Sequence, residues 1–445
     1  MYASGKPIGF WSAVLLGMGA MIGAGIFALL GQAGAVAGTA VWLSFLLGGG
    51  VAMLSGYSFA RLGVRYPSSG GLVEYLVRGW GDGFVSGTGA FVLYLSGVLA
   101  LALIAKAFGS YASAVVLGEP ERWLVDAFAL SVVAVLTALN LRGAGDVTRF
   151  ENLVVLLKIG VLCLFVGLAA PSVETARLAP GTYPGAFHVA ASIGFTFFAF
   201  EGFRVITNAA EDMPDPGRML PASMFVSIAL VAGLYVLLSL VVFGTLSVDE
   251  AVAAKDYALA RAATPVLGPA GFLVVGIAAM VSTASAINAN LYAVTNVAYR
   301  MATFGALPAA FGRPIARSRE GLLITAAVVM LLVPSLDLAS IAVVGSLTIL
   351  LVHIAVHAGH LRLLRETGAS GLLVTAALLA SSAVVATVLA FELSATRDGL
   401  ARLAAFVAAA VALELLFRHL AGRGLRRRQV PPPDEHGGAG GTDDV

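Results

Sequence analysis

A lysine in the middle of a long apolar segment is the residue best placed to do chemistry in this chain. Lys158 follows the run Leu153-Val154-Val155-Leu156-Leu157 and precedes Ile159-Gly160-Val161-Leu162. At ~1.5 Å of rise per helical residue, it lies about 12 Å beyond Phe150, where the segment begins. Lysines at such a depth usually face other helices and mark an ion or proton path. The alternative is a lysine whose long stem reaches interfacial water.

The first apolar segment is crowded with glycine. It contains Gly17-Met18-Gly19-Ala20-Met21-Ile22-Gly23-Ala24-Gly25-Ile26-Phe27. Each glycine costs a helix ~1 kcal/mol relative to alanine, and backbone groups freed inside a bilayer survive only where protein or a cavity covers them. The run therefore predicts a helix that is interrupted in its middle, at a site for something polar. The alternative is that the glycines let neighbouring helices pack closely.

Composition indicates a membrane protein. The 445 residues are 59% hydrophobic and only 12% charged, with a mean hydropathy of +0.92. Repeated apolar runs of about 20 residues can each cross ~30 Å of hydrocarbon, which predicts an all-α polytopic membrane protein in a lipid bilayer. A net charge of +2 is too small to indicate a nucleic-acid partner. The single Cys163 offers neither a disulfide nor a metal cluster.

Twelve apolar segments are expected to be transmembrane helices. They lie at roughly 8–35, 39–62, 84–117, 123–141, 150–171, 186–210, 221–246, 266–300, 321–334, 337–358, 371–391 and 399–418. The first ten form two sets of five, and an odd number of helices inverts the second set in the membrane. We expect one domain over 1–418, with a first repeat at about 8–171, a second at about 186–358 and two extra helices at 371–418. Residues 419–445 are polar and rich in Pro and Gly, which predicts a disordered tail.

Basic residues predict the orientation of the chain. With the N-terminus in the cytoplasm, the inner loops and termini hold 18 Lys and Arg residues, and the outer loops hold 6. Lys and Arg gather on the cytoplasmic side of membrane proteins. We therefore expect a multi-pass protein of the cell membrane with both termini, and the tail, in the cytoplasm.

A second glycine interrupts the sixth segment, which is the counterpart of the first in the two sets of five. Gly202 lies between the charged residues Glu201 and Arg204, which are three positions apart and can pair on a helix. Paired interruptions at matching positions of two repeats indicate a transporter binding site. For either glycine, close packing alone is the alternative.

Four motifs in order resemble one family. They are Gly19 to Phe27 in the first span, Tyr66-Pro67-Ser68-Ser69-Gly70-Gly71-Leu72-Val73-Glu74-Tyr75 after the second, Phe198-Ala199-Phe200-Glu201-Gly202-Phe203 with Asn208 to Pro216 in and after the sixth, and Asn288 to Pro308 in and after the eighth. The chain resembles the prokaryotic amino acid permeases of the amino acid–polyamine–organocation superfamily, in particular their proton-coupled, broad-specificity branch. The resemblance implies the leucine-transporter fold and amino acid transport. No nucleophile–base or metal constellation in the spans suggests an enzyme.

An interrupted helix can bind the head group of an amino acid through its backbone. Free N–H groups at the positive end of a half-helix are expected to receive the carboxylate, and they belong to Gly23, Ala24, Gly25 and Ile26. Free carbonyls are expected to receive the ammonium, and they lie near Met21 and Ile22 and from Phe198 to Glu201, beside Gly202. This recognition ignores the side chain and so predicts a class of substrates.

Aromatic residues flank the second interruption. Phe198, Phe200 and Phe203 are candidates for a pocket wall over an apolar substrate side chain, with ordinary core packing as the alternative. Neutral, mostly apolar amino acids are therefore the leading expectation. For Glu201, a mutual ion pair with Arg204 is favoured over a contact with the substrate ammonium or the carriage of a proton.

The resemblance also implies a role for Lys158. In sodium-coupled relatives of the fold, a cation sits between the first, fifth and eighth helices, and the Lys158 ammonium would occupy that place. Its partners would be a carbonyl near Gly19 and the hydroxyl of Ser282 or Thr283. We therefore expect import by proton symport with alternating access, without sodium, a bound metal or a cofactor.

Two other functions remain open. Exchange of two amino acids needs no titratable group, so Lys158 counts against it. An amino acid sensor would usually carry a soluble signalling domain, which residues 419–445 are too few to form. His353, His357 and His360 have a spacing that could suggest a metal site, but no acidic or cysteine residue joins them in the sequence.

Overall fold

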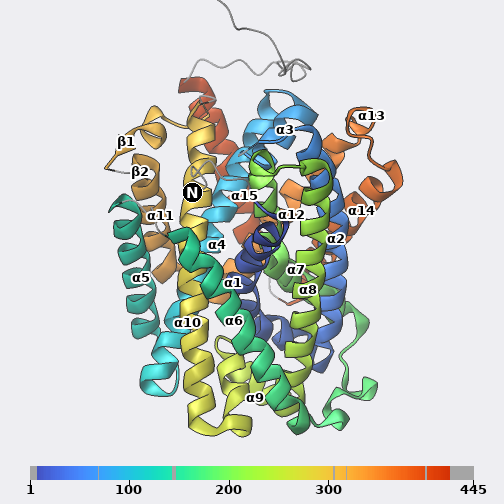
Figure 1. Cartoon of the computed structure of the whole chain (residues 1–445), viewed down its shortest axis with the longest axis vertical. Helices are drawn as coiled ribbons and strands as arrows, with labels where there is room; N and C mark the ends of the chain where they lie inside the picture. The colour runs from blue at the N-terminus through green and yellow to red at the C-terminus, as the bar shows by residue number, and fades with distance from the viewer. Residues whose placement is uncertain are drawn as a thin grey trace, which may run out of the picture.

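The computed structural model describes residues 8–68, 70–142, 147–303, 306–316, 318–395 and 398–420. Long helices run roughly along the longest dimension of the molecule (Figure 1). The short helices α3 (Leu72–Trp80) and α13 (Leu364–Thr367) lie at one end, and α9 (Val248–Ala253) lies at the other. α1 (Phe10–Ala37) lies inside the bundle, where it contacts α7 (Ala186–Phe200), α8 (Pro216–Thr245) and α10 (Ala258–Thr303).

Every expected apolar segment overlaps a helix. The other long helices are α2 (Val41–Arg65), α4 (Phe84–Leu117), α5 (Arg122–Arg142), α6 (Val147–Ala169), α11 (Glu320–Ser335), α12 (Leu338–His360), α14 (Gly371–Ala395) and α15 (Asp398–Leu420). The 3-10 helices are η1 (Gly38–Ala40), η2 (Ala170–Ser172), η3 (Thr175–Leu178), η4 (Pro180–Thr182), η5 (Glu201–Asp212) and η6 (Ala309–Gly312). Two very short strands, β1 (Pro314–Ile315) and β2 (Ser318–Arg319), pair antiparallel, with Pro314 opposite Arg319.

A polytopic α-helical membrane protein is confirmed. Within the described ranges, nine helical stretches are long and apolar enough to cross a bilayer. Two further apolar stretches, Phe10–Gly23 and Glu320–Ser335, are shorter. Twelve crossings, the inverted repeat and the domain limits therefore stay predictions. The expected tail begins inside α15, and its residues 421–445 lie outside the described part of the chain.

One glycine divides α10. Gly268 has a φ of 66°, a left-handed conformation that side chains disfavour. α10 is thus two helices joined at a kink, and the longer one corresponds to the eighth expected span.

The first helix is not interrupted, contrary to the expectation from its glycines. α1 is helical from Phe10 to Ala37. The sixth segment does change where expected, because the α-helix α7 ends at Phe200 and η5 continues as a 3-10 helix from Glu201 to Asp212. A 3-10 helix has 3.0 residues per turn instead of 3.6, so the side chains after Phe200 point in directions that differ from those of a continued α-helix.

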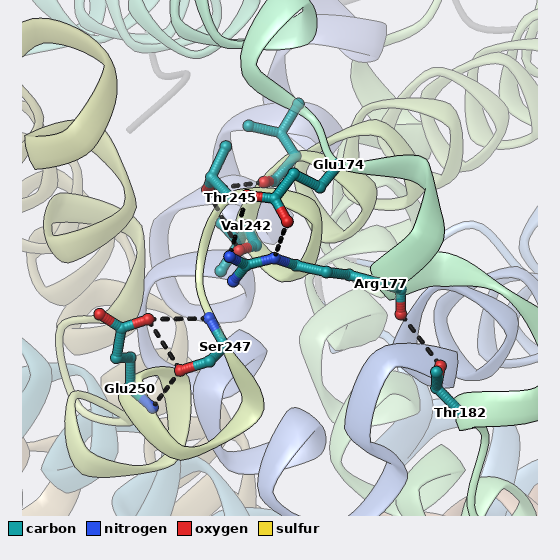
Figure 2. Close-up of polar contacts among 8 residues, drawn as sticks. Glu174, Arg177, Thr182, Val242, Thr245, Ser247 and Glu250 are labelled. Carbon is teal, nitrogen blue, oxygen red and sulfur yellow. Dashed lines mark hydrogen bonds and ion pairs between the residues drawn. The ribbon is translucent and has the colours of Figure 1, made fainter.

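Loops at the α9 end of the bundle are held by short-range hydrogen bonds (Figure 2). The Arg177 guanidinium donates to the Glu174 carboxylate at 2.8 and 3.0 Å, and the Thr182 hydroxyl donates to the Arg177 carbonyl at 3.0 Å. Ser247 and Glu250 form a capping box at the start of α9, with reciprocal bonds of 2.9 and 3.2 Å. The bond from the Ser247 backbone N–H is the main cause that lowers the pKa of the Glu250 carboxyl.

Replacing Ser247 with alanine should lower the stability by ~1 kcal/mol, the usual cost of a lost N-cap. Because the pKa of Glu250 is lowered in the folded state, its contribution is present above the ordinary carboxyl pKa and is lost as the pH falls through the lowered value. Alanine keeps the backbone N–H but removes the bond from the Ser247 hydroxyl to Glu250, so only the part of the stability difference that comes from this side-chain bond should shrink in acid. Thermal unfolding in detergent at neutral and acidic pH measures it.

Ser131→Ala is the matched control for this substitution. Ser131 is exposed and donates only to the Phe128 carbonyl of its own helix, at 2.8 Å. Its removal should leave the melting temperature unchanged. An equal loss of stability in both variants would contradict the capping role of Ser247.

Candidate functional site

The face of α6 that carries Lys158 is turned into the protein. Lys158 is 2% exposed, whereas Leu153, Leu156 and Leu157 are 62%, 54% and 58% exposed. The Lys158 ammonium donates a hydrogen bond of 2.7 Å to the Gly19 carbonyl of α1. A snorkelling lysine would expose its amine, so the burial favours the interpretation that this lysine faces other helices.

Side chains from three helices donate to the backbone carbonyls of the glycine-rich turns of α1. Besides Lys158 of α6, the Tyr235 hydroxyl of α8 donates to Met21 at 2.8 Å, and the Ser282 hydroxyl of α10 donates to Ile22 at 3.4 Å. A carbonyl oxygen has two lone pairs, so these bonds are compatible with the helical hydrogen bonds of α1. The middle of α1 therefore already has side-chain partners for its carbonyls.

The two hydroxyls expected near Lys158 have different partners in the structure. Ser282 and Thr283 are both fully buried in α10. Ser282 contacts α1 through the Ile22 carbonyl, whereas the Thr283 hydroxyl donates to the Ala279 carbonyl of its own helix at 2.7 Å. Ser282 thus belongs to the side chains around α1, and Thr283 is satisfied within α10.

The glycines of α1 mark close approaches of neighbouring helices. A methyl group at Gly19 would lie 2.7 Å from the Val155 side chain of α6, and one at Gly23 would collide with Ala286 of α10. These positions have no room for a side chain. The packing interpretation therefore describes this structure, and tertiary contacts keep α1 helical despite its unfavourable residues.

The two glycine-rich sites lie against each other. A methyl group at Gly25 of α1 would lie 2.5 Å from the Ala199 carbonyl oxygen of α7. Gly202 of η5 faces the backbone of Ala20 and Met21, again without room for a side chain. The structure thus brings the backbones of both predicted half-sites into direct contact.

Tyr235 bridges this contact, and the sequence analysis missed it. Its fully buried hydroxyl donates to the Met21 carbonyl at 2.8 Å and lies 3.4 Å from the Ala199 carbonyl oxygen. A tyrosine within an apolar span must find a polar partner, because the bilayer offers none. That requirement was the available signal, but it could not identify the partner.

The three phenylalanines of the sixth segment fill the interior. Phe198, Phe200 and Phe203 are 6%, 0% and 0% exposed. The Phe200 ring centroid lies 5.2 Å from that of Tyr235, and the Phe203 ring stacks on Phe59 of α2 at 5.9 Å. The Phe198 ring lies against Gly345 of α12, so in this structure all three rings pack as core residues.

Glu201 contacts two buried partners. One carboxylate oxygen lies 2.5 Å from Nε of Arg204, which confirms the mutual ion pair expected from the sequence. The other oxygen lies 3.1 Å from Nε2 of His353 in α12, a contact that was not expected. Within the ranges that the structure describes, no three His, Cys, Asp or Glu side chains are arranged to hold a metal ion.

A cavity borders the contact between Lys158 and α1. Its lining includes Gly19 of α1, Asn152 and Val155 of α6, and Ala286 and Asn290 of α10. Gly19, whose carbonyl accepts the bond from Lys158, therefore lines space that protein atoms do not fill.

These features define a polytopic helical membrane protein with a buried cation bonded to the backbone of its first helix. The family described as amino acid permease matches residues 8–412, and the chain belongs to that family. It is a transporter of amino acids in a membrane and not an enzyme.

Named relatives agree with this membership. The inner membrane transport protein YbaT of Escherichia coli (strain K12) is 38% identical, over 82% of this chain and 85% of its own. The methylthioribose transporter of Bacillus subtilis (strain 168) is 28% identical, over 69% of each chain. The branched-chain amino acid permease BcaP of the same organism is 26% identical, over 77% of this chain and 78% of its own.

Adding a methyl group at Gly202 should destabilise the protein by ~2 kcal/mol, as overpacked cores are. The new atom meets the backbone of Ala20 and Met21, which cannot move aside as a flexible side chain would. Gly160→Ala in α6 is the matched control, because no atom lies within 4 Å of a methyl group there. Thermal unfolding in detergent compares the two. A Gly202→Ala protein as stable as Gly160→Ala would contradict the backbone contact.

Proposed function

We propose that this permease imports amino acids by proton symport and that Lys158 binds the coupling proton. The 2.7 Å bond from the Lys158 ammonium to the Gly19 carbonyl carries the proposal. A charged donor makes a stronger hydrogen bond than a neutral one. The protonated lysine therefore stabilises the closed form of α1, and loss of the proton weakens its hydrogen bond to α1. Sodium has no part in this cycle.

Weakening the bond between Lys158 and α1 matters because the middle of α1 can open at low cost. Each glycine lowers the stability of a helix by ~1 kcal/mol relative to alanine. Three carbonyls of these turns accept bonds from α6, α8 and α10, so they would keep partners if the helical hydrogen bonds were lost. We infer that α1 is closed in this structure and opens when substrate binds.

An opened turn would expose backbone groups for both charges of an amino acid. The carboxylate would bind the N–H groups of Gly23, Ala24, Gly25 and Ile26. The ammonium would bind carbonyls near Met21, Ile22 and the end of α7, which continues into Glu201 and Gly202. The contact of Gly25 with Ala199 supports the proposal, because it places these groups side by side.

Neutral, mostly apolar amino acids fit this site best. Phe198, Phe200 and Phe203 are buried beside the junction and would line an apolar side chain. Glu201 and Arg204 pair with each other, so neither offers a free charge to an acidic or basic substrate. Among the relatives, one is named for branched-chain amino acids and another for methylthioribose.

Alternating access would carry the substrate and the proton to the cytoplasm. The cavity beside Lys158 is lined from the first halves of α1 and α6, as at Leu16 and Asn152. The predicted orientation, with both termini in the cytoplasm, puts these halves on the cytoplasmic side. The cavity is then the exit path of the proton.

Lys158→Ala should reduce uptake driven by a pH gradient by more than about tenfold, since a hydrogen bond to a charged group contributes ~1.5–3 kcal/mol. Uptake of labelled leucine into proteoliposomes measures it. Lys255→Ala, which alters an exposed lysine, should transport as wild type does. Full uptake by Lys158→Ala, or a need for sodium, would contradict symport. Uptake only against internal substrate would instead support exchange.

A competition panel under the same pH gradient tests the substrate class. Unlabelled neutral apolar amino acids should reduce leucine uptake, whereas acidic and basic ones should not, because their side-chain charges would be buried without partners. Methylthioribose belongs in the panel, since a relative is named for it. Equal competition by acidic or basic amino acids would contradict the apolar pocket.

A further inference from the structure

His353 differs from the next histidine of α12 in its hydrogen bonds. Its ring is fully buried and its Nε2 lies 3.1 Å from a Glu201 oxygen, but neither ring nitrogen has a hydrogen-bond partner. His357, one turn later, is bonded at both nitrogens, to Ser55 at 3.1 Å and to Ser58 at 3.0 Å. His353 alone of these two rings therefore keeps a buried nitrogen that can accept a proton without breaking a bond.

The donor and the acceptor of each hydrogen bond made by His357 and His360 can be assigned by starting from Thr367. The Thr367 hydroxyl donates to the Leu363 carbonyl at 3.1 Å, so it accepts from Nε2–H of His360 at 2.9 Å. Nδ1 of His360 then accepts from the Ser58 hydroxyl, whose oxygen accepts from Nδ1–H of His357. Both rings are neutral in this arrangement. These two histidines hold α12 against α2, and His360 also bonds to Thr367 of α13.

The surroundings of His353 can accommodate a positive charge. The ring centroids of Phe59, Phe197 and Phe203 lie 4.7, 5.3 and 6.1 Å from that of His353. The Glu201 carboxylate supplies a negative charge 3.1 Å from Nε2. This carboxylate is the group that would stabilise an imidazolium.

The charged and titratable groups around His353 come from few elements. Glu201 and Arg204 belong to η5, and His357 belongs to α12 itself. α2 contributes Phe59 and serine hydroxyls, and Tyr75 of α3 packs on the Phe59 ring at 6.4 Å. With neutral His353, the charges of Glu201 and Arg204 cancel. One added proton gives the cluster a single positive charge.

Because Glu201 and His353 lie where α12 meets the junction of α7 with η5, a proton on His353 would affect how firmly these elements are held together. Glu201 is the first residue of η5, and its neighbour Gly202 lies against the backbone of α1. His353 lies in α12, so its contact with Glu201 ties α12 to the junction of α7 with η5. The two groups form no hydrogen bond in this structure, whereas a protonated ring beside a carboxylate can form a charge-assisted one, so protonation of His353 strengthens this contact.

We propose that Glu201 and His353 form a second proton-binding site, distinct from Lys158, which controls how firmly α12 holds the junction of α7 with η5. With the proton bound, the imidazolium pairs with the carboxylate and the junction is held. Without it, no opposite charges attract the ring to Glu201, and the junction moves more readily. The proposal requires a transporter, which the family membership establishes, and it does not depend on Lys158 as the coupling group.

Exchange of labelled for unlabelled leucine across proteoliposomes, at equal pH on both sides, follows the conformational cycle without a gradient. The wild-type rate should rise about fivefold as the pH is raised and the ring loses its proton, because its contact with Glu201 weakens. His353→Gln keeps a donor toward Glu201 but cannot take the proton. Its rate should lose this fivefold rise, while uptake driven by a pH gradient persists.

His357→Gln is the matched control, because it alters the same residue type one turn away on the same helix. It should keep the pH profile of the wild type, at some cost in stability from the lost serine bonds. A His353→Gln profile that follows the wild type would overturn the proposal, as would an equal flattening in His357→Gln. Neither result would bear on uptake by Lys158→Ala, which tests the symport separately.

A second measurement does not depend on how the variants fold. Histidine NMR signals of the whole wild-type protein in lipid nanodiscs report the protonation of each ring. As the pH of the sample is lowered, the His353 signal, assigned through its contact with Phe197, should show that this ring gains a proton, whereas the His357 signal should not. A His353 ring that keeps one protonation state at every pH at which the protein transports would overturn the proposal.

Discussion

The structure depends on one contact between two backbones, that of α1 with the junction of α7 and η5. Gly25 and Gly202 permit it, because a side chain at either position would collide with the opposite helix. Inside a bilayer, backbone groups can rely only on the protein for partners. The Tyr235 hydroxyl meets this need: it donates to the Met21 carbonyl of α1 and lies within hydrogen-bond distance of the Ala199 carbonyl. The Phe200 ring packs against the Tyr235 ring. Polar groups at this buried contact therefore have hydrogen-bond partners.

Polar side chains gather around this contact for the same reason. Lys158, Tyr235 and Ser282 come from three helices and donate to carbonyls in adjoining turns of α1. An isolated donor at such a depth would be costly, whereas a helical carbonyl can accept a second bond. In the proposed mechanism, these donors also let the turns open without leaving their carbonyls unpaired.

Two buried residues that can carry a proton contact the two halves of this meeting point, Lys158 at α1 and His353 at the first residue of η5. Lys158 is bonded to a neutral carbonyl of α1, so its charge is opposed there by a dipole. His353 faces the carboxylate of Glu201, whose charge Arg204 already balances. In the proposals above, a proton on Lys158 braces α1, and a proton on His353 braces the junction of α7 with η5. The same backbone contact thus responds to both.

The sequence by itself determined the helical membrane class and the family, and it drew attention to Lys158 and Gly202, because apolar length, motif order and an isolated charge are properties of contiguous residues. It also indicated the pairing of Glu201 with Arg204, which lie on one helical turn. Only the tertiary structure decided that α1 is uninterrupted, because a glycine breaks a helix or packs it according to what lies against it. Only the tertiary structure supplied Tyr235 and His353, since these partners come from helices distant in the chain.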